Sequence, residues 1–163
     1  MGKHVQYDAG ARDEIAAFFQ NRAAALSRGD DAAFAAAFQT PLTVPVGRHQ
    51  KFFAATQAEM TGIVNQYRAN LLVECYDQTV CQVIRYATAP GGAVQTLVRW
   101  RHLNTRGAEI TRIDADHVSI RQHDGHWVDR HVQFLSEPKQ RLIAGLPIHH
   151  VLRKGEIKHL LGS

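Results

Sequence analysis

The chain has 163 residues, of which 45% are hydrophobic, and a formal net charge of +4. This length suits one domain with a sizeable core, and the ordinary hydrophobic fraction argues against a disordered or fibrous protein. No apolar run approaches the roughly 20 residues of a membrane helix, and the first ten residues contain no apolar signal segment. We therefore expect a soluble cytoplasmic protein without a membrane partner.

The first third of the chain predicts two helices in succession. After an arm of residues 1–10, apolar residues at helical spacing indicate a helix over residues 13–28. Gly29 is placed to end this helix, and Asp30 is placed to cap a short second one. Pro41 would stop the second helix, because proline lacks the backbone N–H that a helix needs.

A strand pair, a third helix and a set of longer strands follow. Residues 42–47 predict a short strand that Pro45 and Gly47 make irregular, with residues 50–53 as its partner. Residues 54–70 predict a third helix, and Tyr67 lies on its apolar stripe. The longer strands are expected over residues 72–88, 94–104, 108–122 and 127–135.

The last two strands form a hairpin around Asp124-Gly125, a dipeptide typical of two-residue hairpin turns. If these two residues form the whole turn, His123 lies opposite His126, and the register of the hairpin follows. That register pairs His117 with Val132, Ser119 with Arg130, and Arg121 with Val128.

One face of this hairpin is much less charged than the other, so we expect it to face the core. His117, Ser119, Arg121, Arg130 and Phe134 belong to this inner face. The outer face would carry Trp127, Asp129 and His131, together with the apolar residues Leu97, Val118, Ile120 and Leu135.

The predicted order is helix, short helix, strand pair, helix and a run of long antiparallel strands, which defines an α+β fold. This order, with Gly29-Asp30, the apolar strand 42–47 and Asp124-Gly125-His126-Trp127, resembles the nuclear transport factor 2-like superfamily. That superfamily includes the ketosteroid isomerases and the SnoaL-like polyketide cyclases. The resemblance implies a cone-shaped curved sheet wrapped around three N-terminal helices over residues 11–136, with one deep pocket. Residues 137–163 would form a short tail that packs on the domain or on a partner subunit.

A comparison with the ketosteroid isomerases shows that their catalytic triad is absent. Their catalytic-base aspartate falls on Val44, their oxyanion tyrosine on Arg22 and their protonated aspartate on His117. Valine cannot accept a proton, so the isomerase mechanism is not expected here.

The candidate site residues are the polar and aromatic side chains that the fold would direct into the pocket. His117 is the residue that could move protons near neutral pH, although a hydrogen-bonded core histidine is the simpler interpretation. Arg22 and Arg130 would stabilise an oxyanion, bind an acidic ligand, or pair with a carboxylate. The expected ligand-binding residues are Val44, Tyr67, Trp100, Ser119, Arg121 and Phe134.

Three functions remain open from the sequence. The preferred function is the binding of a small, mostly apolar molecule. In one version of this hypothesis the molecule is also acidic. The alternatives are a lyase, isomerase or cyclase that uses His117 as its acid–base group, and a protein-interaction module. We expect a homodimer through the outer face of the sheet.

No cofactor, metal or nucleic acid is expected. The histidines lack the spacing of a closed zinc site, and no glycine-rich phosphate loop is present. Arg99, Arg101, Arg106 and Arg112 cluster along one hairpin, but the acidic residues nearby argue for a solvated or subunit-facing surface.

Overall fold

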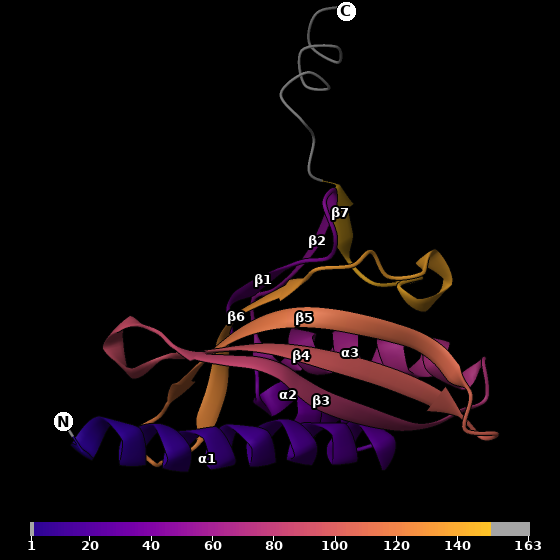
Figure 1. Cartoon of the computed structure of the whole chain (residues 1–163). Coiled ribbons are helices and arrows are strands. Elements are labelled where there is room, and N and C mark those ends of the chain that lie inside the picture. Colours follow the sequence, from indigo (N-terminus) through magenta and orange to yellow (C-terminus); the bar gives the residue numbers. More distant parts are fainter. Residues whose placement is uncertain (1, 151–163) are drawn as a thin grey trace, which may run out of the picture.

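The computed structural model describes residues 2–150, which form three α-helices and two antiparallel β-sheets (Figure 1). The α+β class and the open curved sheet around the helices agree with the prediction. The elements are α1 (Gly2–Ser27), α2 (Asp31–Ala36), β1 (Leu42–Pro45), β2 (Gln50–Ala54), α3 (Gln57–Leu72), β3 (Tyr76–Thr88), β4 (Val94–Asn104), β5 (Glu109–Arg121), β6 (Trp127–Phe134) and β7 (Ile148–His150).

The break between α1 and α2 lies at Gly29 and Asp30, as predicted. The Asp30 side chain accepts a hydrogen bond from the N–H of Ala33 at the start of α2, and Thr56 caps α3 by accepting from Glu59. Gly29 has a φ of +82°, and a Cβ there would lie 2.9 Å from the Arg68 guanidinium. The N-terminal arm was predicted wrongly, because α1 already begins at Gly2. None of the helices within residues 2–150 is long and apolar enough to cross a membrane.

The larger sheet has the strand order β3-β4-β5-β6, and its inner face packs on the helices. Ile15 and Phe19 of α1 are fully buried in the same cluster as Val98 and Trp100 of β4. Residues of β4 and β5 alternate between buried and half-exposed, as expected for strands with one covered face. His117 and Ser119 lie on the buried face, so the predicted inner side of β5 is correct.

The smaller sheet has the order β1-β2-β7, and its strand β1 lies beside β6, the edge strand of the larger sheet (Figure 1). The segment after β6 supplies β7, which pairs with β2. Within this segment Leu142 is fully buried against Leu71, Tyr76 and Ile110. The described part of the tail therefore packs on its own domain, while residues 151–163 of the predicted tail lie outside the described residues.

The β5–β6 hairpin differs from its predicted register by one residue. Residues 122–126 connect the strands, and a bulge lies between the pairs Val118–His131 and Ser119–Asp129, so Arg130 is the extra residue. The pairing of His117 with Val132 is correct, whereas Ser119 pairs with Asp129 and Arg121 pairs with Trp127.

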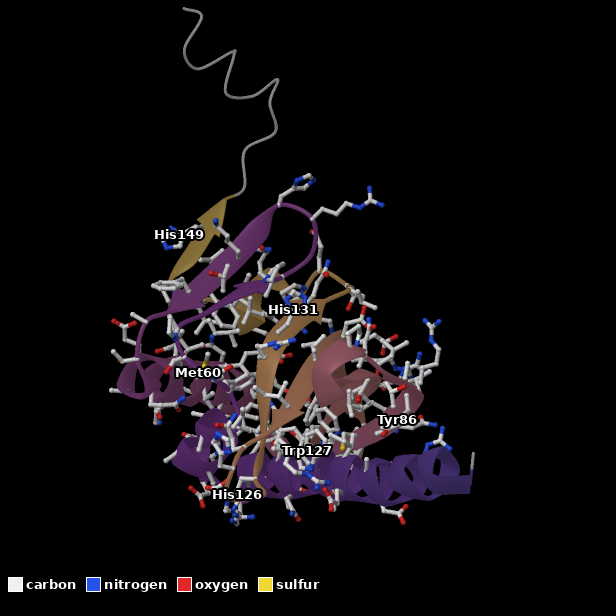
Figure 2. The ribbon with its side chains drawn as sticks, turned by 90° about the vertical axis from the view of Figure 1, so that its left-hand side faces the viewer. Met60, Tyr86, His126, Trp127, His131 and His149 are labelled. Carbon is white, nitrogen blue, oxygen red and sulfur yellow. The ribbon has the colours of Figure 1, made fainter. Side chains whose placement is uncertain are left out.

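The bulge moves every residue of β6 that precedes it to the opposite face of the sheet. Arg130 is exposed and Asp129 is fully buried, which is the reverse of the prediction. Trp127 lies close to α1, where its indole N–H donates to Glu14 at 2.9 Å (Figure 2). Trp127 and Asp129 therefore do not belong to the outer face.

Candidate functional site

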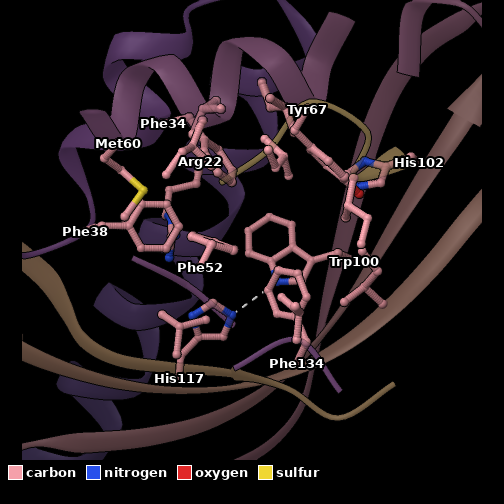
Figure 3. A pocket seen from close by; sticks show the side chains of 18 residues that line it. Arg22, Phe34, Phe38, Phe52, Met60, Tyr67, Trp100, His102, His117 and Phe134 are labelled. Atoms are coloured by element: carbon pink, nitrogen blue, oxygen red, sulfur yellow. Dashed lines mark hydrogen bonds between the residues drawn. The ribbon is translucent and has the colours of Figure 1, made fainter. Parts of the chain in front are cut away.

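A cavity of about 80 Å³ lies between the inner face of the sheet and the three helices. One water needs about 10–15 Å³ on this scale, so the cavity has room for a small ligand or several waters. Most of its wall is aromatic or aliphatic (Figure 3). The lining residues are Arg22, Leu26, Phe34, Phe38, Val46, Phe52, Met60, Ile63, Val64, Tyr67, Trp100, His102, Ile113, His117, Val132, Phe134, Ile143 and Leu146.

Five of the nine predicted site residues line this cavity, namely Arg22, Tyr67, Trp100, His117 and Phe134. Val44 and Ser119 are buried but lie behind the wall. Two arginines were placed wrongly. Arg130 is exposed at the bulge, and Arg121 is exposed at the end of β5, where it pairs with Glu14 and lies over the Trp127 ring.

Asp129 is the centre of a buried polar network at the cavity wall. Its Oδ2 accepts from Arg22 Nη1 at 2.6 Å and from His117 Nδ1 at 2.8 Å, and its Oδ1 accepts from the Ser119 hydroxyl at 2.7 Å. The side chains of Arg22 and Asp129 are 3% and 0% exposed. A charge removed from water to this degree is tolerable only when it is paired and hydrogen-bonded.

Sequence reasoning missed Asp129 because the bulge that turns it inward carries no clear sequence signal. The backbone around it is also held from outside the hairpin, since Asp129 N–H donates to Ala37 O at 2.7 Å and Gln39 N–H donates to Asp129 O at 2.8 Å. The end of α2 thus fixes the bulged part of β6. The available hint was Arg130, which interrupts the alternate apolar positions between Val128 and Val132.

The hydrogen bonds of His117 define its tautomer. The Trp100 indole N–H can only donate, and it lies 3.2 Å from His117 Nε2, so that nitrogen carries no proton (Figure 3). The proton is on Nδ1 and is donated to Asp129. Burial lowers the pKa of His117, although the negative charge of Asp129 opposes this effect. The sequence did not reveal this carboxylate partner of His117, because Asp129 was expected on the outer face.

The same contacts set the charge of Asp129. Burial alone would raise the pKa of its carboxyl group, but the charge of Arg22 and the hydrogen bonds from His117 and Ser119 keep that pKa below its usual value. The network at this wall therefore contains one positive charge, one negative charge and a neutral imidazole.

Arg22 is further stabilised by aromatic rings. Its guanidinium carbon lies 4.6 Å from the centre of the Phe38 ring and 5.6 Å from that of Trp100, with Phe18, Phe19 and Phe34 at intermediate distances. Among the described residues only Nη1 of this guanidinium has a hydrogen-bond partner. Nε and Nη2 are buried, and no described residue offers them an oxygen or nitrogen acceptor.

Tyr67 and His102 form a second polar group on the cavity wall, with ring centres 5.4 Å apart. His102 Nδ1 is 2.7 Å from the Thr79 hydroxyl, and burial lowers the pKa of His102 to about 4. Burial also raises the pKa of Tyr67, so its hydroxyl stays protonated. That hydroxyl is buried and has no hydrogen-bond partner among the described residues.

The cavity is close to the molecular surface at one place. A groove on the surface of the domain is lined by Phe53, Glu59, Gln66, Gly145 and Pro147 among others. Ile63 and Leu146 line both this groove and the cavity, so these two side chains form the wall between them. Among residues 2–150 no group of three or more His, Cys, Asp or Glu side chains is arranged to hold a metal ion.

The sequence profile of a family described as NTF2-like protein (DUF6841) matches residues 13–134, which is most of the chain. The chain belongs to this NTF2-like family. Its membership agrees with the resemblance seen in the sequence. A comparison with curated proteins found no match.

Solved structures show the same fold at low sequence identity. ActVI-ORFA from Streptomyces coelicolor has a TM-score of 0.60 and 16% identity, covering 89% of this chain and 99% of that one. A domain of unknown function with a cystatin-like fold from Nostoc punctiforme has a TM-score of 0.61 and 16% identity, covering 78% of each chain. A Catenulispora acidiphila protein in complex with S-DNPA has a TM-score of 0.55 and 18% identity, covering 77% of this chain and 94% of that one.

Proposed function

We propose that this protein binds a small, mostly apolar molecule in the cavity between the sheet and the helices. The observation that carries the proposal is a buried space whose walls are aromatic and aliphatic and which is bordered by a few polar groups, as in small-molecule sites. The Catenulispora acidiphila protein, which shares the fold, is a complex with a small molecule, S-DNPA. This precedent supports ligand binding as a use of the fold.

We propose a neutral ligand instead of the acidic one that a lone arginine would suit. The charge of Arg22 is balanced by Asp129 at 2.6 Å. A carboxylate in the cavity would place a second anion beside one cation, in a site where burial holds His117 neutral. An unbalanced buried charge is costly, so a neutral molecule fits better.

Titration with a small apolar compound, followed by the indole N–H signals in NMR spectra, tests the binding proposal. The chain has two tryptophans, which makes the readout simple. Trp100 lines the cavity, whereas Trp127 does not, so the Trp100 signal should shift while the Trp127 signal stays in place. Equal shifts of both signals, or no shift at saturating compound, would contradict the proposal.

Acid–base catalysis by His117 is a second candidate, because Asp129 holds the imidazole in one tautomer with Nε2 as the proton acceptor. The Trp100 N–H occupies that nitrogen, so a substrate would have to displace it. Turnover of a bound substrate that is lost on His117→Gln and retained on Trp100→Phe would establish this role. Turnover that survives His117→Gln would exclude it.

We also propose that two copies associate through the outer face of the larger sheet. Without Trp127, the apolar part of this face consists of the half-buried Leu97, Val118 and Ile120 and of Leu135, which is 50% exposed. Sedimentation should show a dimer at micromolar concentration that Ile120→Asp converts to a monomer. A monomeric unmodified protein would rule this assembly out.

A further inference from the structure

The hydrogen bonds of the cavity wall are made within the wall or behind it. The lining residues whose side chains carry nitrogen or oxygen are Arg22, Tyr67, Trp100, His102 and His117. Arg22 and His117 both bond to Asp129, and His102 bonds to Thr79, while neither Asp129 nor Thr79 lines the cavity. The Trp100 N–H donates to His117 inside the wall (Figure 3). These bonds therefore leave little for a ligand to use.

The polar atoms of the wall that lack a described partner are also out of reach. They are Nε and Nη2 of Arg22 and the hydroxyl oxygen of Tyr67, and each is too deeply buried to touch a water-sized atom in the cavity. Almost all of the surface that faces the cavity is apolar. The cavity thus offers a bound molecule apolar contact and almost no hydrogen bonding.

Such a wall discriminates against polar groups on the ligand. A hydroxyl or carbonyl group that enters the cavity gives up its hydrogen bonds to water and finds no replacement, which costs free energy. Water has the same difficulty, because an enclosed water needs about two to four polar partners. A hydrocarbon loses no hydrogen bond on entry and gains contact with the wall. The cavity therefore favours molecules without any polar group.

The volume of the cavity limits the size of the molecule. An apolar cavity of about 150 Å³ can hold benzene. The cavity here has about 80 Å³, and the rings around it pack on each other, with Phe34 at 5.8 Å from Phe38 and 5.9 Å from Trp100. Close-packed rings do not give way easily to a larger molecule. A ligand of roughly four carbon atoms is the size that fits.

We propose that the cavity binds a compact hydrocarbon of about four carbon atoms that carries no hydrogen-bonding group. This inference rests on the proposed binding function and adds the class and the size of the molecule. Contact with the aromatic and aliphatic wall supplies the affinity. Selectivity comes from the rejection of molecules of the same shape that carry a hydroxyl or a carbonyl group.

Two pairs of compounds with matched shapes test the inference on the full chain. The first pair is isobutane and 2-propanol, and the second is isobutene and acetone, so each pair exchanges one hydrocarbon group for oxygen. Dissociation constants are measured from the shift of the Trp100 indole signal, with the gases dissolved under pressure. We expect each oxygen compound to bind at least about a hundredfold more weakly than its hydrocarbon partner, because its oxygen would be buried without a hydrogen bond.

The Val132→Ile variant tests whether the hydrocarbons bind in this cavity. Val132 is 1% exposed and lines the cavity, so one added methylene group takes up part of the space. Isoleucine is also β-branched and suits a strand. Isobutane and isobutene should bind at least about fivefold more weakly, because a small cavity cannot hold both the added group and the ligand. Val94→Ile is the matched control, because Val94 is 2% exposed on the same sheet but does not line the cavity. It should leave both dissociation constants unchanged.

The outcomes separate this inference from the proposed function. If neither hydrocarbon shifts the Trp100 signal but naphthalene does, the cavity binds apolar molecules and the inferred size is wrong. If no apolar compound shifts the signal, the binding function itself fails. If 2-propanol or acetone binds within about tenfold of its hydrocarbon partner, the wall offers a reachable polar atom and the inference is wrong. Unchanged hydrocarbon binding in Val132→Ile would place the hydrocarbons elsewhere and would also overturn the inference.

Discussion

Two arginine–aspartate pairs lie on opposite sides of the four-stranded sheet. On the inner side Arg22 and Asp129 are 3% and 0% exposed, whereas on the outer side Arg99 and Asp114 are 33% and 31% exposed. The outer pair has the better geometry, with two N–H···O bonds of 2.9 and 3.1 Å between neighbouring strands. The inner pair has one such bond and a hydrogen-bonded histidine and serine. Burial, and not the number of hydrogen bonds, therefore decides which pair has the larger effect on the stability of the protein.

The largest expected effect comes from breaking the inner pair. Arg22→Met would leave the Asp129 carboxylate buried without its cation, and it should lower the free energy of unfolding by about 3–5 kcal/mol. Chemical denaturation followed by circular dichroism measures this loss. A loss below about 1 kcal/mol would mean that Asp129 is reached by water or by another cation.

Replacing both residues of the inner pair tests whether the two side chains depend on each other. In the double variant Arg22→Met with Asp129→Leu, no charge remains buried, so most of the lost stability should return. The same denaturation experiment gives the coupling between the two residues. If the double variant is as unstable as the sum of the single variants, the two side chains act independently.

Acidification should affect the inner side of the sheet through its buried histidines. Burial lowers the pKa of His102 to about 4, so between the unfolded value near 6.5 and pH 4 the unfolded chain binds a proton that the folded chain does not. Stability should therefore fall as the pH falls through this window, by about 3 kcal/mol for His102. The lowered pKa of His117 acts in the same direction.

Denaturation curves at several pH values would check this dependence. His102→Gln should flatten the slope between pH 6.5 and 4. Asp129 contributes in a more acidic range, because its lowered pKa makes its stabilisation disappear only below its unfolded value near 3.8. An unchanged slope in His102→Gln would show that burial does not lower the pKa of this ring in the folded protein.

The smallest effect is expected from the outer pair. Arg99→Met should leave the midpoint of denaturation close to that of the unmodified protein, because exposed ion pairs are screened by water and salt. A large loss in a monomeric protein would contradict the comparison. A loss that depends on protein concentration would instead point to the outer face as the dimer contact.

The sequence predicted those parts of the site that depend on regular periodicity. The period of two in β4 and β5 placed Trp100 and His117 on the inner face. Asp30 located the start of α2, and the spacing of apolar residues located α3. The sequence could not place Asp129, because the bulge at Arg130 is held by backbone hydrogen bonds between Asp129 and both Ala37 and Gln39, which are distant in sequence. Arg121 was misplaced for a different reason. It is on the expected face, but it lies beyond the cavity, where α1 offers it Glu14.

The rate at which small molecules enter and leave the cavity should depend on the wall formed by Ile63 and Leu146. Because Ile63 and Leu146 line both the cavity and the outer groove, we expect small molecules to enter and leave by the rotation of these two side chains, without separation of strands or helices. Side-chain rotations are fast compared with local unfolding. Residence times of small ligands should therefore be short unless the ligand is held by hydrogen bonds inside, and the size of these two residues would set the rate of exchange while the interior sets the affinity.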